Sequence, residues 1–353
     1  MRKKAAVVGG GIGGLAAAIG LRAAGWKVTV FERGTHLPET GTGLGMWPTA
    51  LRALDRLGLG EQARKVGRPQ ASGAIRRPDG SRIATLDMER LRRRHGEPVY
   101  LLSRPALLGL LHDALPPDVV HFGHTVDDPG PLREGYDVVI GADGINSGVR
   151  RALFGDRHRL RYTGMTVWRG VADLDTETGG ETWGVGRKFG ITPEEPGRTN
   201  WYAVLAAPEG YTPSDPDVVE LRRHFGSWHD PIPAILDRYA TSRVIRHDIY
   251  YLDPPLPSYV DGTVALLGDA AHAMTPDLGQ GACQALIDGV TLADCLATGD
   301  VPAGLREYDR LRRRPTQRLA AMSTRASRLS QVRRFTAVRD VAVRLALAFG
   351  PPG

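Results

Sequence analysis

The sequence predicts an α/β fold in which elements of a parallel sheet are separated along the chain by antiparallel strands, with helices at the C-terminal end. Residues 5–8, 13–24 and 27–31 follow the order strand, helix, strand that begins a parallel sheet. The apolar runs 136–141 and 263–267 come much later. They suit strands of the same sheet, because buried parallel strands are continuously apolar.

Antiparallel strands are predicted between these runs. Residues 73–86 are typical of a hairpin whose turn contains Asp79 and Gly80. From residue 159 onward, polar and apolar side chains alternate, as they do in a sheet with one buried face. The expected strands are 162–174, 181–189, 200–206 and 242–252, and the expected short helices are 218–225 and 232–239.

This order of elements predicts two interleaved domains and a helical end. The first domain holds the parallel sheet and is discontinuous, and the second is inserted into it as an antiparallel sheet. The expected boundaries are 1–72, 103–158 and 259–300 for the first domain, 73–102 and 159–258 for the second, and 301–353 for the C-terminal helical segment.

The C-terminal segment is strongly basic. Residues 301–353 hold twelve arginines and three acidic residues, a net charge of +9, whereas the rest of the chain carries −2. Such a segment can attract an anionic cofactor, a membrane or nucleic acid, but its aromatic residues are too sparse to stack bases. We expect a solvated arginine-rich face, no nucleic-acid partner and no stable membrane insertion. An apolar stripe on the same segment is expected to be a packing face, and it consists of Phe335, Val338, Val341, Leu345 and Phe349.

The two cysteines indicate a reducing, cytoplasmic location. Cys283 and Cys295 lie in one predicted helix, 281–296, and twelve residues of helix span about 18 Å. No disulfide bridges that distance, and two such thiols make no metal site. We therefore expect no metal. A signal peptide is rejected, because a glycine cluster interrupts the apolar run after Lys4.

A glycine motif follows the first strand and opens the first helix. Gly9 permits a tight turn, Gly11 lets a pyrophosphate approach the backbone, and Gly14 lets helix and strand pack closely. The amides of Ile12 and Gly13 would point at the phosphates from the helix N-terminus.

An acidic residue completes this pattern. Glu32 ends the second strand, where its carboxylate can accept hydrogen bonds from ribose hydroxyls, and Arg33 follows it. Strand, helix and acid together predict a Rossmann-type dinucleotide site. They do not distinguish NAD from FAD.

Two further segments resemble motifs of known flavoproteins. The segment 136–151 begins YDVVIGADG, and the segment 265–281 begins ALLGDAAH and ends GQG. With the glycine motif, they occur in the order found in class A flavoprotein monooxygenases and span nearly the whole chain. The sequence therefore resembles the FAD-dependent aromatic hydroxylases of the para-hydroxybenzoate or salicylate hydroxylase type, which include urate hydroxylase-like and zeaxanthin epoxidase-like members.

The resemblance implies FAD binding by the first domain and assigns roles to several residues. Asp269 would accept a hydrogen bond from a ribityl hydroxyl, and Arg104 would lie along the phosphates and ribityl chain. Asp143 would link the cofactor to NAD(P)H handling, and the backbone of Val126 would meet the adenine. The other implied contacts are the loop Gly43, Leu44 and Gly45 beside the isoalloxazine, then Pro276, and Gly279, Gln280, Gly281 and Ala282 at the pyrimidine edge.

The implied reaction is hydroxylation of a small aromatic or phenolic substrate, with NADPH or NADH as reductant and O2 as oxidant. The family works through a C4a-hydroperoxide of the reduced flavin, so most of the chemistry belongs to the cofactor. The second domain would hold the substrate. Trp168, Arg169 and Tyr202 are the candidates to line its pocket, and the arginine favours an anionic or phenolate-like molecule.

Several alternatives stay open at this point. Epoxidation or Baeyer–Villiger oxygenation would use the same fold, and a flavin-binding regulatory protein would show no turnover. His272 is interpreted as a core residue rather than a base. Gln284 and Ile287 depart from the family pattern, which makes the substrate of any one relative an unsafe guide. The sequence does not indicate an oligomeric state.

Overall fold

The parallel sheet has six strands taken from distant parts of the chain. The structure is a computed structural model that describes residues 2–39, 41–177, 179–238 and 244–348. Strand β1 pairs in parallel with β2 on one side and β9 on the other, and Ala5, Ala6 and Val7 are fully buried. Only the edge pair β15–β16 is antiparallel. The order is β15 (Val260–Asp261), β16 (Val264–Leu266), β9 (Val138–Gly141), β1 (Lys4–Val8), β2 (Lys27–Glu32) and β8 (Val120–Phe122).

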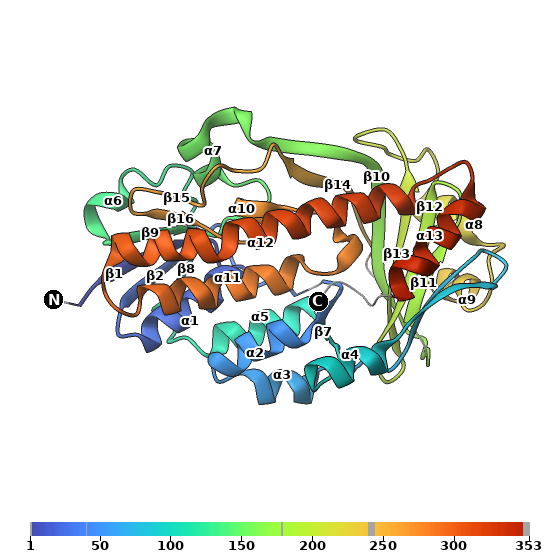
Figure 1. Ribbon diagram of the computed structural model, residues 1–353, viewed down its shortest axis with the longest axis horizontal. Helices are drawn as coiled ribbons and strands as arrows, with labels where there is room; N and C mark the ends of the chain where they lie inside the picture. Colours follow the sequence, from blue (N-terminus) through green and yellow to red (C-terminus); the bar gives the residue numbers. More distant parts are fainter. Residues whose placement is uncertain (1, 40, 178, 239–243, 349–353) are drawn as a thin grey trace.

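Helices cover this sheet, and glycines set how closely they pack. A Cβ on Gly289 of α11 (Gly281–Leu296) would lie 2.5 Å from the carbonyl oxygen of Gly13 in α1 (Ile12–Ala23), so the two helices touch along their backbones. Figure 1 shows them beside other helices of the same layer. These are α2 (Pro48–Arg56), α3 (Gly60–Val66) and α5 (Arg104–Asp113), while α6 (Leu132–Gly135) and α7 (Gly148–Phe154) lie on the other side.

The second sheet has seven strands and joins the 73–86 hairpin to the segment 159–253. All neighbouring strands are antiparallel except β11 and β5. Its order is β14 (Ile245–Asp253), β10 (Arg159–Ala172), β13 (Arg198–Ala206), β12 (Arg187–Glu195), β11 (Gly179–Trp183), β5 (Gly73–Arg76) and β6 (Arg82–Leu86). The helix α4 (Met88–His95) follows β6.

Two expectations about single elements were wrong. Segment 181–189 forms the end of β11 and the start of β12, because Gly186 has a φ of +62° and reverses the chain after Gly184. Segment 43–45 is a strand rather than a loop, because a partner distant in sequence pairs with it. The resulting small sheet has the order β3 (Gly43–Met46), β7 (Tyr100–Ser103) and β4 (Arg68–Pro69).

One face of the seven-stranded sheet is an aromatic core. Trp168, Phe189 and Trp201 are buried there, and the rings of Phe189 and Trp201 stack at a centroid distance of 5.7 Å. Helices α8 (Asp217–Phe225) and α9 (Ile232–Asp237) cover this face. The expected helix end at Tyr239 and strand start at Ser242 lie outside the described residues.

Two C-terminal helices connect the sheets. α12 (Val301–Ser330) spans much of the molecule in Figure 1: the Tyr308 hydroxyl donates to the Leu266 carbonyl at 2.9 Å, near the six-stranded sheet. α13 (Thr336–Ala348) packs on β6, where Arg344 Nε donates to the Ile83 carbonyl at 3.1 Å. None of the helices described in the structure is long and apolar enough to cross a membrane.

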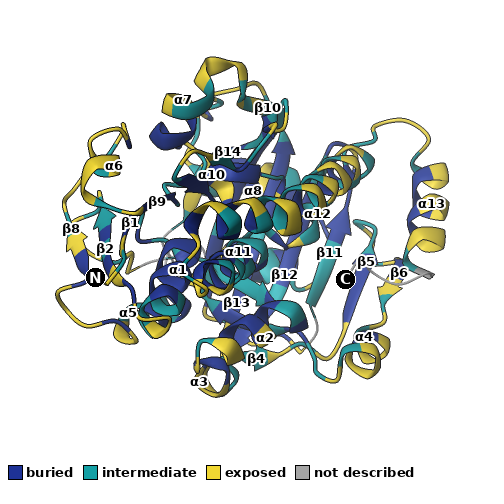
Figure 2. Cartoon of the chain, turned by 60° about the vertical axis from the view of Figure 1, so that its left-hand side comes forward, coloured by how far each residue is buried: buried dark blue, intermediate teal, exposed yellow. Residues whose placement is uncertain are grey.

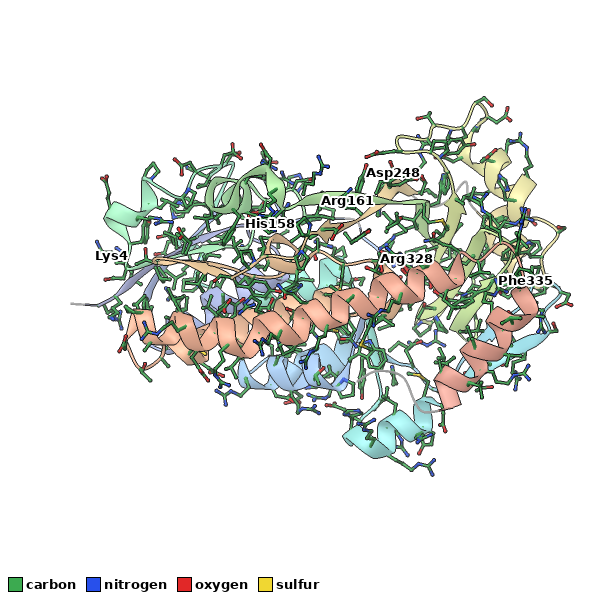
Figure 3. The ribbon with its side chains drawn as sticks, turned by 45° about the horizontal axis from the view of Figure 1, so that its top comes forward. Lys4, His158, Arg161, Asp248, Arg328 and Phe335 are labelled. Carbon is green, nitrogen blue, oxygen red and sulfur yellow. The ribbon has the colours of Figure 1, made fainter. Side chains whose placement is uncertain are left out.

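The predicted packing face of α13 was wrong. Phe335 is 80% exposed and Val338 66% exposed, and Val341 and Leu345 are exposed as well, whereas Val343 faces the sheet. Figure 3 places Phe335 at the turn between α12 and α13, and Figure 2 shows exposed residues along the outer side of α13. Phe349 lies outside the described residues. The helix turns Val343 and Leu347, rather than the longer predicted stripe, toward β6.

Candidate functional site

The glycine motif and the segment 136–151 meet at the ends of β1 and β9. Gly9 has a φ of +110°, and a Cβ on it would lie 2.3 Å from the carbonyl oxygen of Ala142. The Ala142 amide in turn donates to the Val8 carbonyl at 2.7 Å. Only glycine fits at position 9, so the two loops form one continuous backbone surface.

The segment 265–281 joins the same surface. A Cβ on Gly13 would lie 2.5 Å from the Leu267 side chain, so α1 packs directly on this segment. Arg150 is buried and donates to the carbonyls of Asp269 and Ala270 at 3.2 Å and of Ile145 at 2.7 Å. The three separated segments therefore converge at one edge of the six-stranded sheet.

Strand β3 links this edge to the seven-stranded sheet. The Gly43 amide donates to Asn200 Oδ1 on β13 at 2.9 Å, and the Cys283 thiol donates to the Gly45 carbonyl at 3.2 Å. Burial raises the pKa of Cys283 to about 12, so this thiol is a neutral packing group. The start of α11, the strand β3 and the sheet face around Asn200 form one continuous wall.

A buried charge cluster lies where the seven-stranded sheet meets the turn before α11. Lys188 Nζ lies 2.9 Å from Asp277 Oδ1 and 3.2 Å from Glu181 Oε1, and the Lys188 and Asp277 side chains are each 6% exposed. Burial lowers the pKa of Lys188, but the two carboxylates outweigh it and raise the pKa overall. Lysine is therefore charged, and the trio carries a net charge of −1.

Tyr202 belongs to the same cluster. Its hydroxyl donates to Glu181, and its ring crosses Gly190, where a Cβ would lie 2.0 Å from the ring. Glycine at position 190 is thus what lets the tyrosine reach its partner. Burial and the Glu181 carboxylate raise the pKa of Tyr202 well above its usual value, which keeps the phenol protonated.

Arg169 lies beside Tyr202 in the sheet register and is half-buried. Within the described parts of the chain, its guanidinium has no hydrogen-bond or carboxylate partner, and its Nε is fully buried. Burial lowers its pKa, Tyr202 opposes that shift, and Arg104 of α5 adds to it. An unpaired cation therefore faces the side of the sheet that meets the nucleotide half.

Trp168 lies on the opposite side. Successive strand residues point to opposite faces, and Trp168 is fully buried in the aromatic core under α8 and α9. This corrects its expected place among the pocket-lining residues. Of the three candidates, the structure brings together Arg169 and Tyr202, and it separates Trp168 from them.

Comparisons with known proteins agree with this geometry. Residues 2–124 and 136–323 match the family model described as "FAD binding domain". The chain belongs to this family. It is a member of the class A flavoprotein monooxygenases, and the matches to its curated relatives cover most of the length of both proteins.

Two curated relatives and one solved structure illustrate this likeness. The chain is 35% identical to an aurachin C monooxygenase/isomerase of Stigmatella aurantiaca, covering 92% of this chain and 89% of the relative. It is 32% identical to a FAD-dependent urate hydroxylase of Klebsiella pneumoniae, covering 87% and 85%. The crystal structure of Klebsiella pneumoniae HpxO with FAD and uric acid has a TM-score of 0.86 at 26% identity, covering 98% of this chain and 92% of that chain.

The residues of this class A monooxygenase fit an FAD. The helices α1 and α11 both begin without a side-chain cap, whereas Ser103 caps α5 and Ser147 caps α7. A Cβ on Gly11 or Gly281 would meet nothing within 4 Å. Two helix N-termini with free amides and open space in front of them suit the phosphates and the flavin pyrimidine edge.

The predicted adenosine-side residues lie at the end of β2. Glu32 accepts hydrogen bonds from the amides of Gly10 and Gly34, both at 2.7 Å, and each of its oxygens retains a lone pair for a ribose hydroxyl. Arg33 next to it is exposed, and Val126 is half-buried against the core. Glu32 thus ends β2, and Val126 follows the neighbouring parallel strand β8.

The predicted flavin-side residues differ in whether their side chains already have hydrogen-bond partners in the protein. Arg104 and Asp269 are exposed, and their side chains form no hydrogen bond or ion pair with any residue that the structure describes. Asp143, in contrast, accepts from Ser147 Oγ at 2.6 Å and from the Val149 amide at 3.1 Å. Arg104 and Asp269 would therefore be free to hold the cofactor chain, while Asp143 fixes the start of α7. Pro276 and Gly279 are exposed in the turn that leads to buried Gln280.

His272 is a buried core residue, as the sequence predicted. Its Nε2 lies 2.6 Å from Asp288 Oδ2, which also accepts from the Gly268 amide at 2.9 Å. Arg312 Nε donates to the other oxygen at 2.6 Å. Burial raises the pKa of Asp288, but Arg312 and His272 outweigh it and the pKa falls to about 2. This network ties α10 (Asp269–His272) and α11 to α12.

Sequence reasoning missed Lys188, Glu181 and Asp277. A lysine and a glutamate in alternating strands look like solvated surface residues, and Asp277 looks like an ordinary turn residue. One signal could have pointed to the cluster: Gly190 lies inside a predicted strand, and a glycine inside a strand often marks a close approach by another group. The structure shows that this group is the Tyr202 ring.

Proposed function

We propose that the protein is an NAD(P)H-dependent FAD monooxygenase that hydroxylates a small anionic or phenolic aromatic molecule. In this proposal, residues 1–72, 103–158 and 259–300 hold the FAD, and residues 73–102 and 159–258 hold the substrate. The single observation that carries it is the unpaired Arg169 guanidinium beside the Tyr202 cluster, on the face next to the turn that precedes α11.

FAD, when bound, supplies the electrons and the activation of O2 for this chemistry. The amides at the start of α11 would stabilise negative charge at the pyrimidine edge by about 0.3–1 kcal/mol, or about 2 where the site is buried. Asp277 lies in the turn immediately before that helix, and its ion pair with Lys188 holds the turn against the sheet. The chain thereby keeps the substrate face at a defined distance from the flavin edge.

Charge on the sheet face favours an anionic substrate. The Lys188 trio carries −1 and is internally paired, so Arg169 is the cation left to bind a ligand. A carboxylate or phenolate ligand would satisfy this guanidinium through charge-assisted hydrogen bonds. The Tyr202 hydroxyl already donates to Glu181, so its oxygen remains available to accept a proton-bearing group of the ligand.

The test is a turnover assay with isotopic oxygen. Purified protein loaded with FAD would be incubated with NADPH or NADH, labelled O2 and a panel of hydroxybenzoates, aminohydroxybenzoates and urate. We expect substrate-stimulated oxidation of the reductant and a product heavier by one labelled oxygen atom. Turnover without incorporation of labelled oxygen would contradict the proposal.

Product structure separates the related reactions. A new ring hydroxyl supports hydroxylation, whereas an epoxide or a ring-inserted ester would identify epoxidation or Baeyer–Villiger oxygenation. If the protein binds compounds of the panel but its flavin is never reduced and reoxidised, it is instead a binding or regulatory protein. A cytoplasmic location remains a prediction, and the two free cysteines on α11 are consistent with it.

A further inference from the structure

Helix α13 turns its charged pair toward the protein and its apolar stripe toward solvent. Arg339 and Asp340 are buried and pair with each other at 2.8 Å. Val338, Val341 and Leu345 are 66%, 54% and 60% exposed. Surface helices ordinarily have the opposite orientation, because burial of apolar surface is favourable and burial of charge is costly. The orientation of α13 therefore leaves an apolar surface in water that the fold itself does not cover.

Specific contacts hold the helix in this orientation. Arg77 of the β5–β6 hairpin pairs with Asp340 at 2.8 Å. Arg339 donates to the Gly184 carbonyl at 3.0 Å, and its guanidinium lies 5.6 Å from the centre of the Trp183 ring. A rotation of α13 that buried the apolar stripe would break all of these contacts. The ion pairs therefore fix the stripe on the outer side, where Figure 2 shows exposed residues along the helix.

The chain around this outer side is basic. In residues 310–348, Asp340 is the only acidic residue, and it is turned toward the sheet. Figure 3 places Arg328 on the last turns of α12 and Phe335 at the turn that follows. The exposed arginines on the end of α12, in that turn and on α13 are Arg325, Arg328, Arg333, Arg334 and Arg344. The apolar stripe thus lies in a segment whose exposed charges are all positive.

An anionic lipid bilayer matches both properties. Apolar side chains of a helix lying in the interface enter the boundary between headgroups and acyl chains, and arginines beside them meet the lipid phosphates. The stripe from Phe335 to Leu345 covers ten residues, or about 15 Å of helix, which suits a helix parallel to the surface. A second copy of this chain fits less well, because joining two such faces would bring the arginines of both copies together.

We propose that the outer side of α13 docks the protein on the surface of an anionic lipid bilayer. The helix lies along the interface and does not cross the bilayer. Because α13 packs on β6, the seven-stranded sheet rather than the six-stranded one is then next to the lipid. On the protein side of α13, the ring of Trp183 lies beside Arg339, and its Nε1 donates to Glu181 Oε2 at 2.5 Å. Docking thus places the lipid surface one helix away from the charge cluster.

The test is flotation of the FAD-loaded protein with lipid vesicles. The vesicles are made of phosphatidylcholine alone or of phosphatidylcholine mixed with phosphatidylserine. We expect binding to the mixed vesicles and weaker binding to phosphatidylcholine alone. The variant Val338→Gln/Val341→Gln/Leu345→Gln should bind at least about 100-fold more weakly, because each aliphatic side chain that enters the lipid contributes about tenfold. Glutamine has good helix propensity, so α13 should persist in this variant.

A second variant tests the charge separately. Arg333→Gln/Arg334→Gln should lower the affinity for the mixed vesicles about 25-fold, because each arginine near an anionic surface contributes about fivefold. Its binding to phosphatidylcholine alone should not change. High salt should likewise reduce the preference of the unmodified protein for the mixed vesicles, because ions screen this attraction.

Matched controls carry the same kinds of substitution elsewhere on the surface. The variant Val66→Gln/Leu311→Gln/Met322→Gln replaces exposed apolar residues of α3 and α12. The variant Arg157→Gln/Arg159→Gln replaces two exposed arginines around the start of β10. Both should bind the two kinds of vesicle like the unmodified protein. Equal weakening in a control and in its α13 counterpart would overturn the inference.

Other occupants of the face would give other results. If the unmodified protein binds neither kind of vesicle, the inference is overturned. A dimer in sedimentation velocity that the α13 variant does not form, without vesicle binding, would assign the face to a second copy and would also overturn it. Vesicle binding is measured without substrate, so this inference does not depend on the proposed reaction. If the protein binds the vesicles through α13 but oxygenates no substrate, the docking face stands and the proposed function fails.

Discussion

At the six-stranded sheet the site is built from backbone, whereas at the seven-stranded sheet it is built from ionised side chains. In the first region, contacts such as Gly9 against Ala142 and Gly13 against Leu267 leave no room for a side chain. In the second, Lys188, Glu181 and Asp277 hold one another in a space nearly closed to solvent. A substitution therefore has different consequences in the two regions: an added side chain disrupts the first, and a removed charge disrupts the second.

This difference reflects what each region has to recognise. A dinucleotide offers phosphates and a polar ring edge, which backbone amides bind without any change of side chain. A substrate differs from one enzyme to the next, so its surroundings are made of side chains whose charges can change while the strands stay in place. The comparison predicts that glycine substitutions act on folding and cofactor content, and that charge substitutions act on substrate handling.

The largest effect is expected for Gly9→Ala. The residue has a φ of +110°, and a Cβ would lie 2.3 Å from the Ala142 carbonyl oxygen, so the two loops must separate. Strain of this kind costs about 1–3 kcal/mol for the backbone alone, and the steric overlap adds to it. We expect a protein that aggregates or is purified without yellow colour, measured by flavin absorbance and by thermal unfolding.

Gly11→Ala is the control for that prediction. A Cβ at Gly11 would meet nothing within 4 Å, so the FAD-free protein should unfold at nearly the same temperature as the unmodified chain. FAD binding should still be weakened, because the added methyl group occupies the space where a phosphate approaches. If both variants kept full flavin content, backbone shape would not determine cofactor binding in this region.

The next largest effect is expected for Lys188→Met. Removing the ammonium leaves the carboxylates of Glu181 and Asp277 close together without a cation, which costs about 3–5 kcal/mol in a buried site. We expect a lower unfolding temperature and a strong loss of coupled product formation. The matched control is Lys65→Met, which breaks the exposed pair with Glu61 and should cost less than about 1 kcal/mol.

Lys188 also predicts a pH dependence. Its pKa in the folded protein is raised above the value near 10.4 of an unfolded lysine, so its contribution is fully present below that pH and is lost as the pH rises through the folded value. The unmodified protein should therefore be more stable than Lys188→Met at neutral pH, and this difference in the free energy of unfolding should shrink at alkaline pH. A constant difference between the two proteins from neutral to alkaline pH would contradict this interpretation.

The two regions also differ in how much the sequence reveals. The parallel sheet, the glycine motif and the segments 136–151 and 265–281 were predictable, because local rules about strands, glycines and helix starts determine them. The two-strand division of segment 181–189 was missed, because one glycine with positive φ decides it. The strand at 43–45 was missed, because its partner lies about 60 residues further along the chain.

The charge cluster could not be predicted for a related reason. Glu181, Gly190, Tyr202 and Arg169 form one row across the sheet, and that row depends on the register of four strands. A slip of one residue in any strand would turn its side chain to the other face. The sequence does indicate Arg169 and Tyr202 as candidates. The same argument from neighbouring aromatic residues also suggested Trp168, which the register places in the aromatic core.

A smaller effect is expected from the Asp288 network, which holds α10 and α11 to α12 behind the nucleotide site. The pKa of Asp288 is lowered to about 2, below the value near 3.9 of an unfolded aspartate. Its contribution of about 2 kcal/mol is therefore present above pH ~4 and is lost as the pH falls toward 2. Asp288→Asn should remove much of this acid sensitivity, measured by unfolding between pH 2 and 5. Equal pH profiles for both proteins would contradict the network's role.

The smallest effect on stability and the most specific effect on ligands are expected for Arg169→Met. Replacing the guanidinium breaks no ion pair with the described residues, so the unfolding temperature should not fall. It should rise slightly where removal of the unpaired, half-buried charge relieves the cost of desolvating it. Salicylate binding, followed by the change in flavin absorbance, should weaken about tenfold, because one charge-assisted hydrogen bond is lost. Salicylamide has the same ring without the carboxylate, and its binding should change little. The control Arg161→Met lies on the same strand but pairs with Asp253 at 3.3 Å and is exposed, so it should leave both ligands unaffected. Equal weakening for salicylate and salicylamide would mean that Arg169 shapes the pocket rather than recognising charge. The seven-stranded sheet would then not recognise its ligand through ionised side chains, as the comparison of the two regions requires.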